Sequence, residues 1–245
     1  MTVSILAKTD FAPRSANDAA RHFAKKAALT DEVFASLSAA AKRYAFRVAG
    51  VHKAHLIQDV RDKVLAAIEK GTSWSQVQRE LLAKFDTESV PRPALHRLKM
   101  MFTTNAQQAY NDARREVLDD PEISESFPFR QYLTVGNGVA GVNNVRAEHA
   151  ALHGKVFAWD DPFWDEHTPP WGFNCRCTFV ALTAGQVASL GVKVLDLNYV
   201  RTRLPVPGTN QRGIAAQPEF ARGGTFDLSG IDAELRAALE RMIGQ

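Results

Sequence analysis

Cysteine is scarce in this sequence: there are 2 among 245 residues, Cys175 and Cys177, separated by a single residue. Such a pair is not the disulfide framework of a small secreted protein. The sequence also lacks any apolar run near the roughly 20 residues that a helix needs to cross a bilayer. Its first residues lack the basic start and continuous apolar stretch of a signal peptide. We therefore expect a protein made in the cytoplasm that contacts no membrane.

Excess charge of one sign is also missing, because the formal net charge is only +3. The surplus of Lys and Arg over Asp and Glu lies in residues 1–111. A basic surface there could contact nucleic acid or an acidic partner. Because no Lys/Arg cluster has interleaved aromatic residues, a solvated helical surface is the simpler interpretation.

Helical periodicity dominates residues 29–128, which we predict to form a helical domain. Apolar residues recur at helical spacing in four segments, and the segments are joined by short connections. A capping box of Ser73 and Gln76 is expected to open the third segment. Residues 1–28 have weak patterns and are expected to form an arm that ends in a short helix. The expected helices cover residues 30–48, 56–68, 73–85 and 94–118.

Residues 129–197 differ in character and predict a small α+β domain with a short antiparallel sheet. Segments of alternating apolar and polar residues predict strands, and Thr183 with Gln186 forms a second capping box. The acidic, aromatic residues 160–167 are expected to form a loop that folds its rings inward. The expected strands cover residues 129–135, 155–159, 173–182 and 192–197, with a helix over residues 144–153.

Residues 198–245 are expected to form an extended tail that ends in a helix. Residues 198–226 are rich in Pro, Gly, Arg and Thr without periodicity, which is typical of a segment that a partner orders. The final helix starts at Ser229 and has an apolar face with no obvious place in the preceding core, so we expect it to dock on another chain. The predicted fold class is α+β: an N-terminal helical bundle, a small mixed α/β domain with a short antiparallel sheet, and an extended C-terminal tail.

Two pairs of side chains between residues 149 and 177 suit a metal ion. His149 and His153 are four residues apart, so they share one face of a helix. Cys175 and Cys177 are two apart, so they share one face of a strand, with Arg176 on the opposite face. Two nitrogen and two sulfur ligands suit zinc, so a structural zinc site is one hypothesis for these residues. The alternative is that these residues serve only to pack a small core.

A catalytic interpretation uses some of the same residues. His149 could act as a general base, and Arg146 and Arg176 could bind phosphate, as in a small nuclease that acts on RNA or DNA. A thiolate next to Arg176 could also be reactive. Because no third catalytic partner or glycine-rich phosphate loop accompanies these residues, the sequence favours a protein that is not an enzyme.

The order of several motifs resembles a known family. These motifs are Arg146-Ala-Glu-His149, Asp161-Pro-Phe-Trp164, Pro169-Pro170 and Asn174-Cys175-Arg176-Cys177. Upstream segments such as Tyr44–Gly50 and Phe102–Asn105 extend the similarity, which covers about residues 36–192. In this order and spacing they resemble the phage Mu F-like minor head proteins, the family of phage head morphogenesis proteins.

This resemblance implies a structural role in head assembly of a tailed phage or an integrated prophage. Members of such a family are expected to bind the portal protein and the major capsid protein or scaffold, with contact to packaged DNA as a further possibility. The implied location is the virion head or procapsid, after synthesis in the host bacterial cytoplasm.

Overall fold

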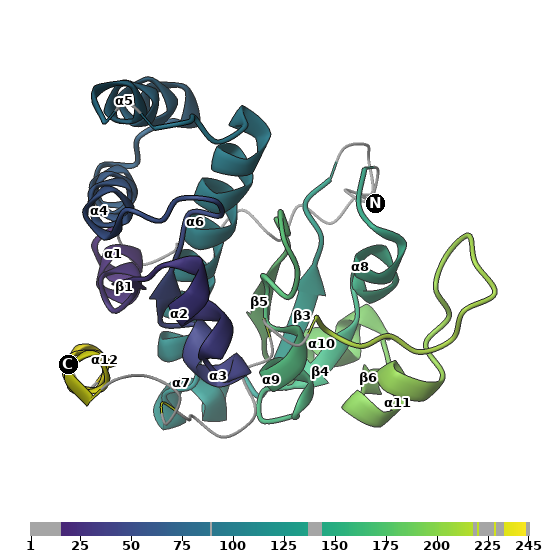
Figure 1. Cartoon of the computed structure of the whole chain (residues 1–245). Helices are drawn as coiled ribbons and strands as arrows, with labels where there is room; N and C mark the ends of the chain where they lie inside the picture. Colours follow the sequence, from purple (N-terminus) through teal and green to yellow (C-terminus); the bar gives the residue numbers. More distant parts are fainter. Residues whose placement is uncertain are drawn as a thin grey trace.

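The computed structural model describes residues 16–88, 90–136, 144–217, 220, 228 and 233–243. A helical half lies beside a smaller half built on a sheet, and the long helix α6 (Leu95–Leu118) runs between them (Figure 1). The α+β class predicted from the sequence is therefore confirmed. Residues 1–15 of the predicted arm lie outside the described residues.

The helical half is built from α1 (Ala16–Ala24), α4 (Ala54–Lys70), α5 (Trp74–Thr87) and α6. The last three match the predicted helices closely, because each has an apolar stripe long enough to bury against its neighbours. Helix α1, the short helix expected at the end of the arm, packs on both α4 and α6. The shared core is made mainly of Phe23, Phe46, Leu56, Ile57, Val60, Val64, Leu81, Phe85, Leu98 and Ala109.

The predicted helix over residues 30–48 is wrong. The structure has two short helices there, α2 (Asp31–Ser36) and α3 (Ala39–Lys42), followed by strand β2 (Ala45–Phe46). Ser38 caps α3 by accepting a hydrogen bond from the Ala41 amide, which separates the two helices. Strand β2 pairs in parallel with β1 (Ala27–Ala28), so tertiary pairing outweighs the helical pattern.

The capping box predicted at Ser73 is also wrong, although Ser73 is the N-cap of α5. Its side chain makes no capping hydrogen bond, and its Oγ lies 3.0 Å from the Ser75 Oγ instead. Helix α6 ends at Leu118, as predicted, and is followed directly by a short helix, α7 (Pro121–Ser126). Proline suits the first turn of a helix, and the Asp120 side chain caps it by accepting from the Glu122 amide.

The sheet of the second half has four strands in the order β5-β3-β4-β6. The central strand β3 (Phe129–Leu133) is antiparallel to β4 (Val156–Ala158) and to β5 (Thr178–Leu182). The edge strand β6 (Val194–Leu195) is parallel to β4, so the predicted antiparallel sheet is right for three strands only. Strand β5 is shorter than predicted and begins after both cysteines.

Three short helices surround this sheet: α8 (Ala147–Leu152), α9 (Phe163–His167) and α10 (Ala184–Leu190). The N-cap of α8 is Arg146, so this helix begins later than the predicted start at residue 144. Helix α9 replaces the predicted loop over residues 160–167. The capping box of Thr183 and Gln186 is confirmed at the start of α10.

The predicted extended tail is wrong for residues 198–217. Helix α11 (Leu197–Thr202) follows the sheet, and the chain then folds back so that Val200, Leu204, Val206 and Ile214 are buried. Gly213 has a φ of +80°, and a Cβ there would collide with the backbone carbonyl of Arg201. The second core thus extends past residue 197. Its largest members are Tyr132, Leu152, Phe157, Phe163, Trp164, Trp171 and Phe179.

The last helix, α12 (Ala233–Ile243), has a place in this fold. Leu228 and Leu235 pack against a small apolar cluster at the N-terminal side of the chain. That cluster consists of Leu29, Leu37, Ala41 and Ala45. The expectation that the apolar face of this helix has no partner in the chain is therefore wrong for Leu235. Among the described residues no helix combines the length and apolar character that crossing a membrane requires.

Candidate metal centre

Three of the four predicted metal ligands meet in the second core. His149 of α8 and the two cysteines that precede β5 place one ligand atom each within 4.8 Å of one another. The Nδ1 atom of His149 lies 3.5 Å from the Sγ atom of Cys175 and 3.5 Å from that of Cys177. All three side chains are buried, at 3% exposure each, and both thiols are free.

Helix α6 holds the loop that carries the cysteines. The Asn174 amide donates to the Thr104 Oγ1 at 3.0 Å, and the Cys177 carbonyl accepts from Gln107 at 2.8 Å and from Asn111 at 3.3 Å. Asn174 has a φ of 56°, which an asparagine side chain tolerates better than most. The cysteines are therefore fixed by a loop anchored to a helix, and not by the strand that the sequence predicts.

Aromatic side chains fix the other partner of the cluster. The His149 ring stacks on Trp171, with centroids 3.7 Å apart and planes 9° apart. Trp171 in turn donates its indole N–H to the Tyr132 hydroxyl at 2.7 Å. This arrangement sets the plane of the imidazole, so that Nδ1 stays directed at the two sulfur atoms.

The two thiols differ in acidity. A hydrogen bond from Cys175, with further ones from His149 and Tyr132, lowers the pKa of Cys177 to about 5 despite burial. The same contact with Cys177, together with burial, raises the pKa of Cys175. Burial, and then the charge of the cysteines, raises the pKa of Tyr132. Metals bind the thiolate, so the hydrogen bonds that lower the pKa of Cys177 favour the form that a metal would bind.

The distances fit a zinc ion. Tetrahedral zinc with bonds of about 2.3 Å to sulfur and about 2.0 Å to nitrogen keeps these ligands roughly 3.5 Å apart. Both sulfur–nitrogen distances in the cluster are 3.5 Å. A cavity of about 160 Å³, lined by His149 and both cysteines, adjoins the cluster and has room for water as a fourth ligand. The donor set and its spacing therefore suit zinc.

His153 does not join the cluster. Helix α8 ends at Leu152, and His153 is its C-cap with φ −55° and ψ 127°, so the rule for residues four apart on a helix no longer applies. Its Nδ1 accepts a hydrogen bond from the Thr134 amide at 3.1 Å and lies 2.8 Å from the Thr134 hydroxyl oxygen. Burial lowers the pKa of His153. The four-ligand set predicted from the sequence is therefore reduced to three.

The residues of the nuclease hypothesis also line the 160 Å³ cavity. Arg146, His149 and Arg176 all contribute to its wall. Arg176 is exposed, as its place between the cysteines predicts. The Arg146 guanidinium lies over Gly172, where a Cβ would come within 2.6 Å of its Nη2. His149, however, is 3% exposed and directs Nδ1 at the sulfurs, a poor position for a base that must reach a substrate.

Two buried residues near this site were not predicted. His167 of α9 is fully buried and stacks on Phe163 at 4.9 Å, and neither ring nitrogen has a hydrogen-bond partner among the described residues. Burial lowers the pKa of His167 to about 3. Helical spacing from Phe163 to His167 is the signal that could have placed this ring inside.

Arg130 of β3 is the second such residue. It is fully buried beneath Trp164 and Phe179, and its Nη2 donates to the Leu118 carbonyl at 2.7 Å and to Asp119 at 2.6 Å. Its pKa is lowered, first by burial. Strand alternation places Arg130 on the same face as Tyr132, which is the pattern that could have revealed it.

Comparisons with known proteins agree on one family. The sequence profile described as Phage Mu protein F like protein matches residues 58–180. The putative capsid assembly protein F of Escherichia phage Mu is 28% identical over 184 residues, or 68% of this chain and 40% of that protein. The Mu-like prophage FluMu F protein of Haemophilus influenzae is 30% identical over 166 residues, or 61% of this chain and 37% of that protein. The chain thus spans less than half the length of these curated relatives.

No solved structure matches this chain. Residues 58–180 make up half of the sequence and run from α4 into β5, so they include α6, His149 and both cysteines. The resemblance that the motifs indicate is therefore confirmed over both halves of the molecule. The chain belongs to the family of phage Mu protein F like proteins.

Proposed function

We propose that this chain is a minor head protein of a tailed phage or prophage, and that it acts by binding other head proteins. The observation that carries the proposal is the similarity to a relative named as a capsid assembly protein, which covers 68% of the chain. The portal protein, the major capsid protein and the scaffold are the proposed partners. The proposed location is the procapsid and the virion head.

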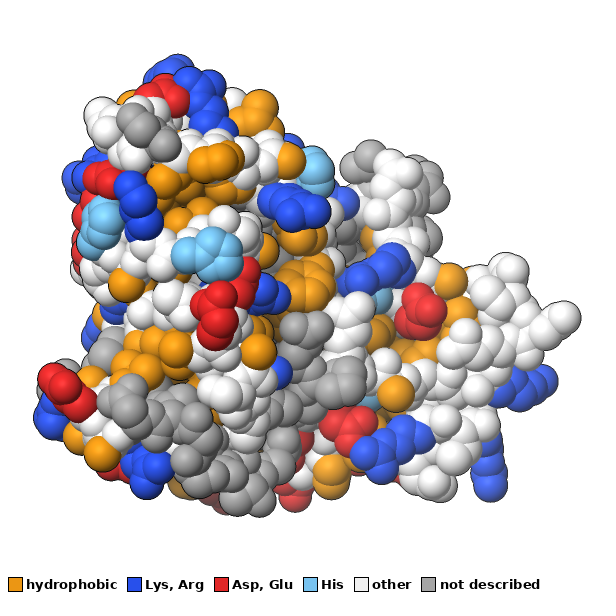
Figure 2. Space-filling view, in the orientation of Figure 1, with side chains coloured by type: hydrophobic (Ala, Val, Ile, Leu, Met, Phe, Trp, Pro, Cys, Tyr) orange, Lys and Arg blue, Asp and Glu red, His pale blue; other side chains and the backbone are white. Residues whose placement is uncertain are grey.

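The chemistry of the best-formed site supports a structural role. The side chains of His149, Cys175 and Cys177 are buried and held by a stacked tryptophan and by helix α6. Such a cluster stabilises the second core and presents little reactive surface to a substrate. Contact with DNA has weaker support, because Lys and Arg side chains are interspersed with Asp and Glu on the face of the helical half drawn in Figure 2.

The test of this function is the composition of particles. The gene is deleted from its phage or prophage, and procapsids and virions are compared by mass spectrometry and cross-linking. We expect the chain in normal particles, cross-linked to the portal or capsid protein, and a loss of infectious particles on deletion. Normal assembly, packaging and infection without the chain would contradict the proposal.

The nuclease alternative has its own test. Purified chain is incubated with single- and double-stranded RNA and DNA across a series of divalent metals. We expect the nucleic acids to stay intact. Cleavage that disappears in His149→Ala, with the fold retained by circular dichroism, would instead establish an enzyme.

We further propose that His149, Cys175 and Cys177 hold a structural zinc ion. The support is the donor set, its burial and the 3.5 Å spacing of the nitrogen from each sulfur. Bound zinc would join α8 to the loop before β5, two segments that the stacking of His149 on Trp171 already brings together. Metal binding and folding would then be coupled in this half of the protein.

A further inference from the structure

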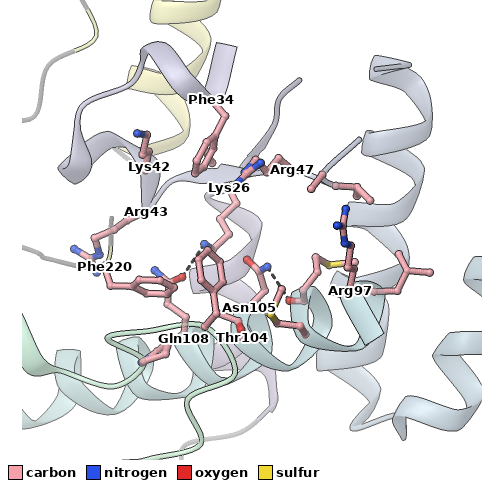
Figure 3. Close-up of a pocket in the computed structure, with 18 of the residues that line it drawn as sticks. Lys26, Phe34, Lys42, Arg43, Arg47, Arg97, Thr104, Asn105, Gln108 and Phe220 are labelled. Atoms are coloured by element: carbon pink, nitrogen blue, oxygen red, sulfur yellow. Dashed lines mark hydrogen bonds between the residues drawn. The ribbon is translucent and has the colours of Figure 1, made fainter. Parts of the chain in front are cut away.

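A second cavity lies between the helical half and the cysteine loop, and Phe173 lines both this cavity and the one beside the metal cluster. It measures about 320 Å³, and its wall comes from α6, from the segment around α3 and β2, and from the loop that contains Pro170 and Phe173 (Figure 3). A volume of this size is typical of a site for a small ligand or for one or two inserted side chains. The cavity is therefore large enough to receive part of a binding partner.

The wall of this cavity carries charge of one sign. Five cationic side chains line it, and its lining within the described part of the chain includes neither Asp nor Glu. The five are Lys26, Lys42, Arg43, Arg47 and Arg97. In Figure 3 the labelled members surround a common space. A wall of this kind favours a ligand with carboxylate or phosphate groups.

The fold neutralises only part of this charge. Arg47 has an ion pair with Asp31 at 2.8 Å, and Arg43 lies 3.4 Å from Asp112. Lys26 is 5% exposed and has partners that include the Gln108 side chain, to which it donates at 2.9 Å. Lys42 lies over the Phe34 ring at 5.4 Å. Arg97 is exposed and has no ion pair among the described residues, so the wall keeps a positive surplus.

The remainder of the wall is apolar and adaptable. Leu98 and Val48 form part of it and are buried, while Met100 and Met101 are partly exposed. Methionine side chains adjust readily to the shape of a ligand. Phe173 is a large apolar side chain that is 39% exposed and lines the same cavity as the five cationic side chains. An apolar side chain could pack here while acidic neighbours reach the cationic rim.

We propose that this cavity binds an acidic peptide segment that inserts an apolar or aromatic side chain. Nucleic acid fits less well, because single strands are bound along extended basic grooves that follow the backbone. The cavity is local, and its apolar wall suits a side chain better than a phosphate. The proposal rests on the proposed function only in assigning the segment to another head protein.

The direct test uses the full chain and synthetic fluorescent peptides in an anisotropy titration. One peptide carries Phe and Leu flanked by Asp and Glu; a second replaces the acids by Lys, and a third replaces Phe and Leu by Ala. A single-stranded oligonucleotide of equal charge is the fourth probe. We expect the first peptide to bind at least about tenfold more tightly than the other probes, with affinity falling at high salt.

Two charge reversals at the rim locate the binding. Arg97→Glu and Lys42→Glu are each expected to weaken binding of the acidic peptide by about tenfold or more. Arg79→Glu is the matched control, because Arg79 is exposed on α5 and does not line the cavity. Melting curves confirm that all three variants fold. Equal affinity in the rim variants and the control, preference for the oligonucleotide, or no binding of the acidic peptide would overturn the proposal.

The result of the peptide-binding test can be distinguished from the result of the test on phage particles. Loss of peptide binding alongside cross-links to the portal or capsid protein would remove the cavity proposal and leave the function standing. Peptide binding by a chain that is absent from particles would support the cavity proposal and contradict the proposed function.

Discussion

Single residues of the second core show two ways to bury an imidazole. His149 stacks on Trp171 and directs Nδ1 at two sulfur atoms. His167 also contacts Trp171, at 5.1 Å and 66°, yet neither of its nitrogens has a partner among the described residues. The first ring faces two possible metal ligands, whereas burial of the second favours its neutral form. Each leads to a separate prediction.

Zinc content is the first prediction at this scale. Protein purified without chelator is expected to contain about one zinc ion per chain, measured by plasma emission spectrometry. Cys175→Ser removes a ligand and is expected to abolish stoichiometric zinc and to lower the melting temperature by roughly 4–8 °C, the equivalent of about 2 kcal/mol.

The matched control for zinc is His153→Ala. The His153 ring contacts the Thr134 hydroxyl and lies outside the ligand cluster, so this variant should keep its metal. Wild-type protein without stoichiometric zinc would reject the site. Loss of zinc in His153→Ala would return this residue to the ligand set.

The pH dependence of stability tests His167. Burial lowers its pKa to about 3, whereas an unfolded histidine titrates near 6.5. Between these values the unfolded chain binds a proton that the folded chain excludes, so stability falls as pH drops below about 6.5, by up to roughly 1.4 kcal/mol per pH unit.

His167→Phe removes this proton and keeps a ring against Phe163. Chemical denaturation at pH 7 and pH 5 should show that the variant loses about 2 kcal/mol less than the wild type over this interval. Carboxylates elsewhere contribute equally to both proteins, so the difference isolates His167. The same slope in both proteins would show that the pKa of His167 is the same in the folded and the unfolded chain.

At the scale of elements, α6 supports both cores and the cysteine loop. Asn111 is 2% exposed; it donates to the Cys177 carbonyl and accepts from the Thr178 hydroxyl at 3.1 Å. Asn111→Ala is expected to lower the free energy of unfolding by about 2 kcal/mol, since it leaves buried polar groups unpaired.

A paired substitution on the same helix serves as the comparison. Gln107→Ala removes one bond to the same carbonyl from a half-buried position, so its cost should be smaller. Denaturant titrations of both variants show which substitution lowers the free energy of unfolding more. A larger effect for Gln107 would show that its bond, and not the buried amide of Asn111, anchors the loop.

Elements could be predicted from the sequence where a long apolar stripe repeats. Helices α4, α5 and α6 have such stripes. Helices α2 and α3 do not form one helix, because Ser38 caps the start of α3 and β2 pairs with β1. The burial of residues 198–217 has no periodic signal, because its apolar residues fill gaps in a core that other segments build.

The candidate site was predictable in composition but not in geometry. The residue types and their proximity in sequence indicate zinc, yet the cysteines lie on a loop before β5 and His153 lies beyond the end of α8. Both differences depend on the bounds of an element: β5 begins at Thr178 and not at residue 173, and α8 ends at Leu152, one residue before His153. Sequence patterns do not fix such boundaries, because capping and tertiary contacts decide them.

At the scale of the whole molecule, the shared helix α6 predicts cooperative unfolding. Its residues contribute to the first core through Leu98 and Ala109 and to the second through Leu118. Native-state hydrogen exchange should therefore give the slowest amides of α4 and β3 the same free energy of opening. Distinct values for the two halves would show that they are independent domains.

One loop borders both proposed sites. Pro170 and Phe173 line the cationic cavity, and a few residues later the same loop supplies Cys175 and Cys177 to the metal cluster. If zinc favours the loop shape that receives the peptide, then the peptide favours the loop shape that holds zinc. Thermodynamic reciprocity requires each ligand to raise the affinity for the other by the same factor. Peptide affinity measured with and without zinc would then change by the same factor as zinc affinity measured with and without the peptide.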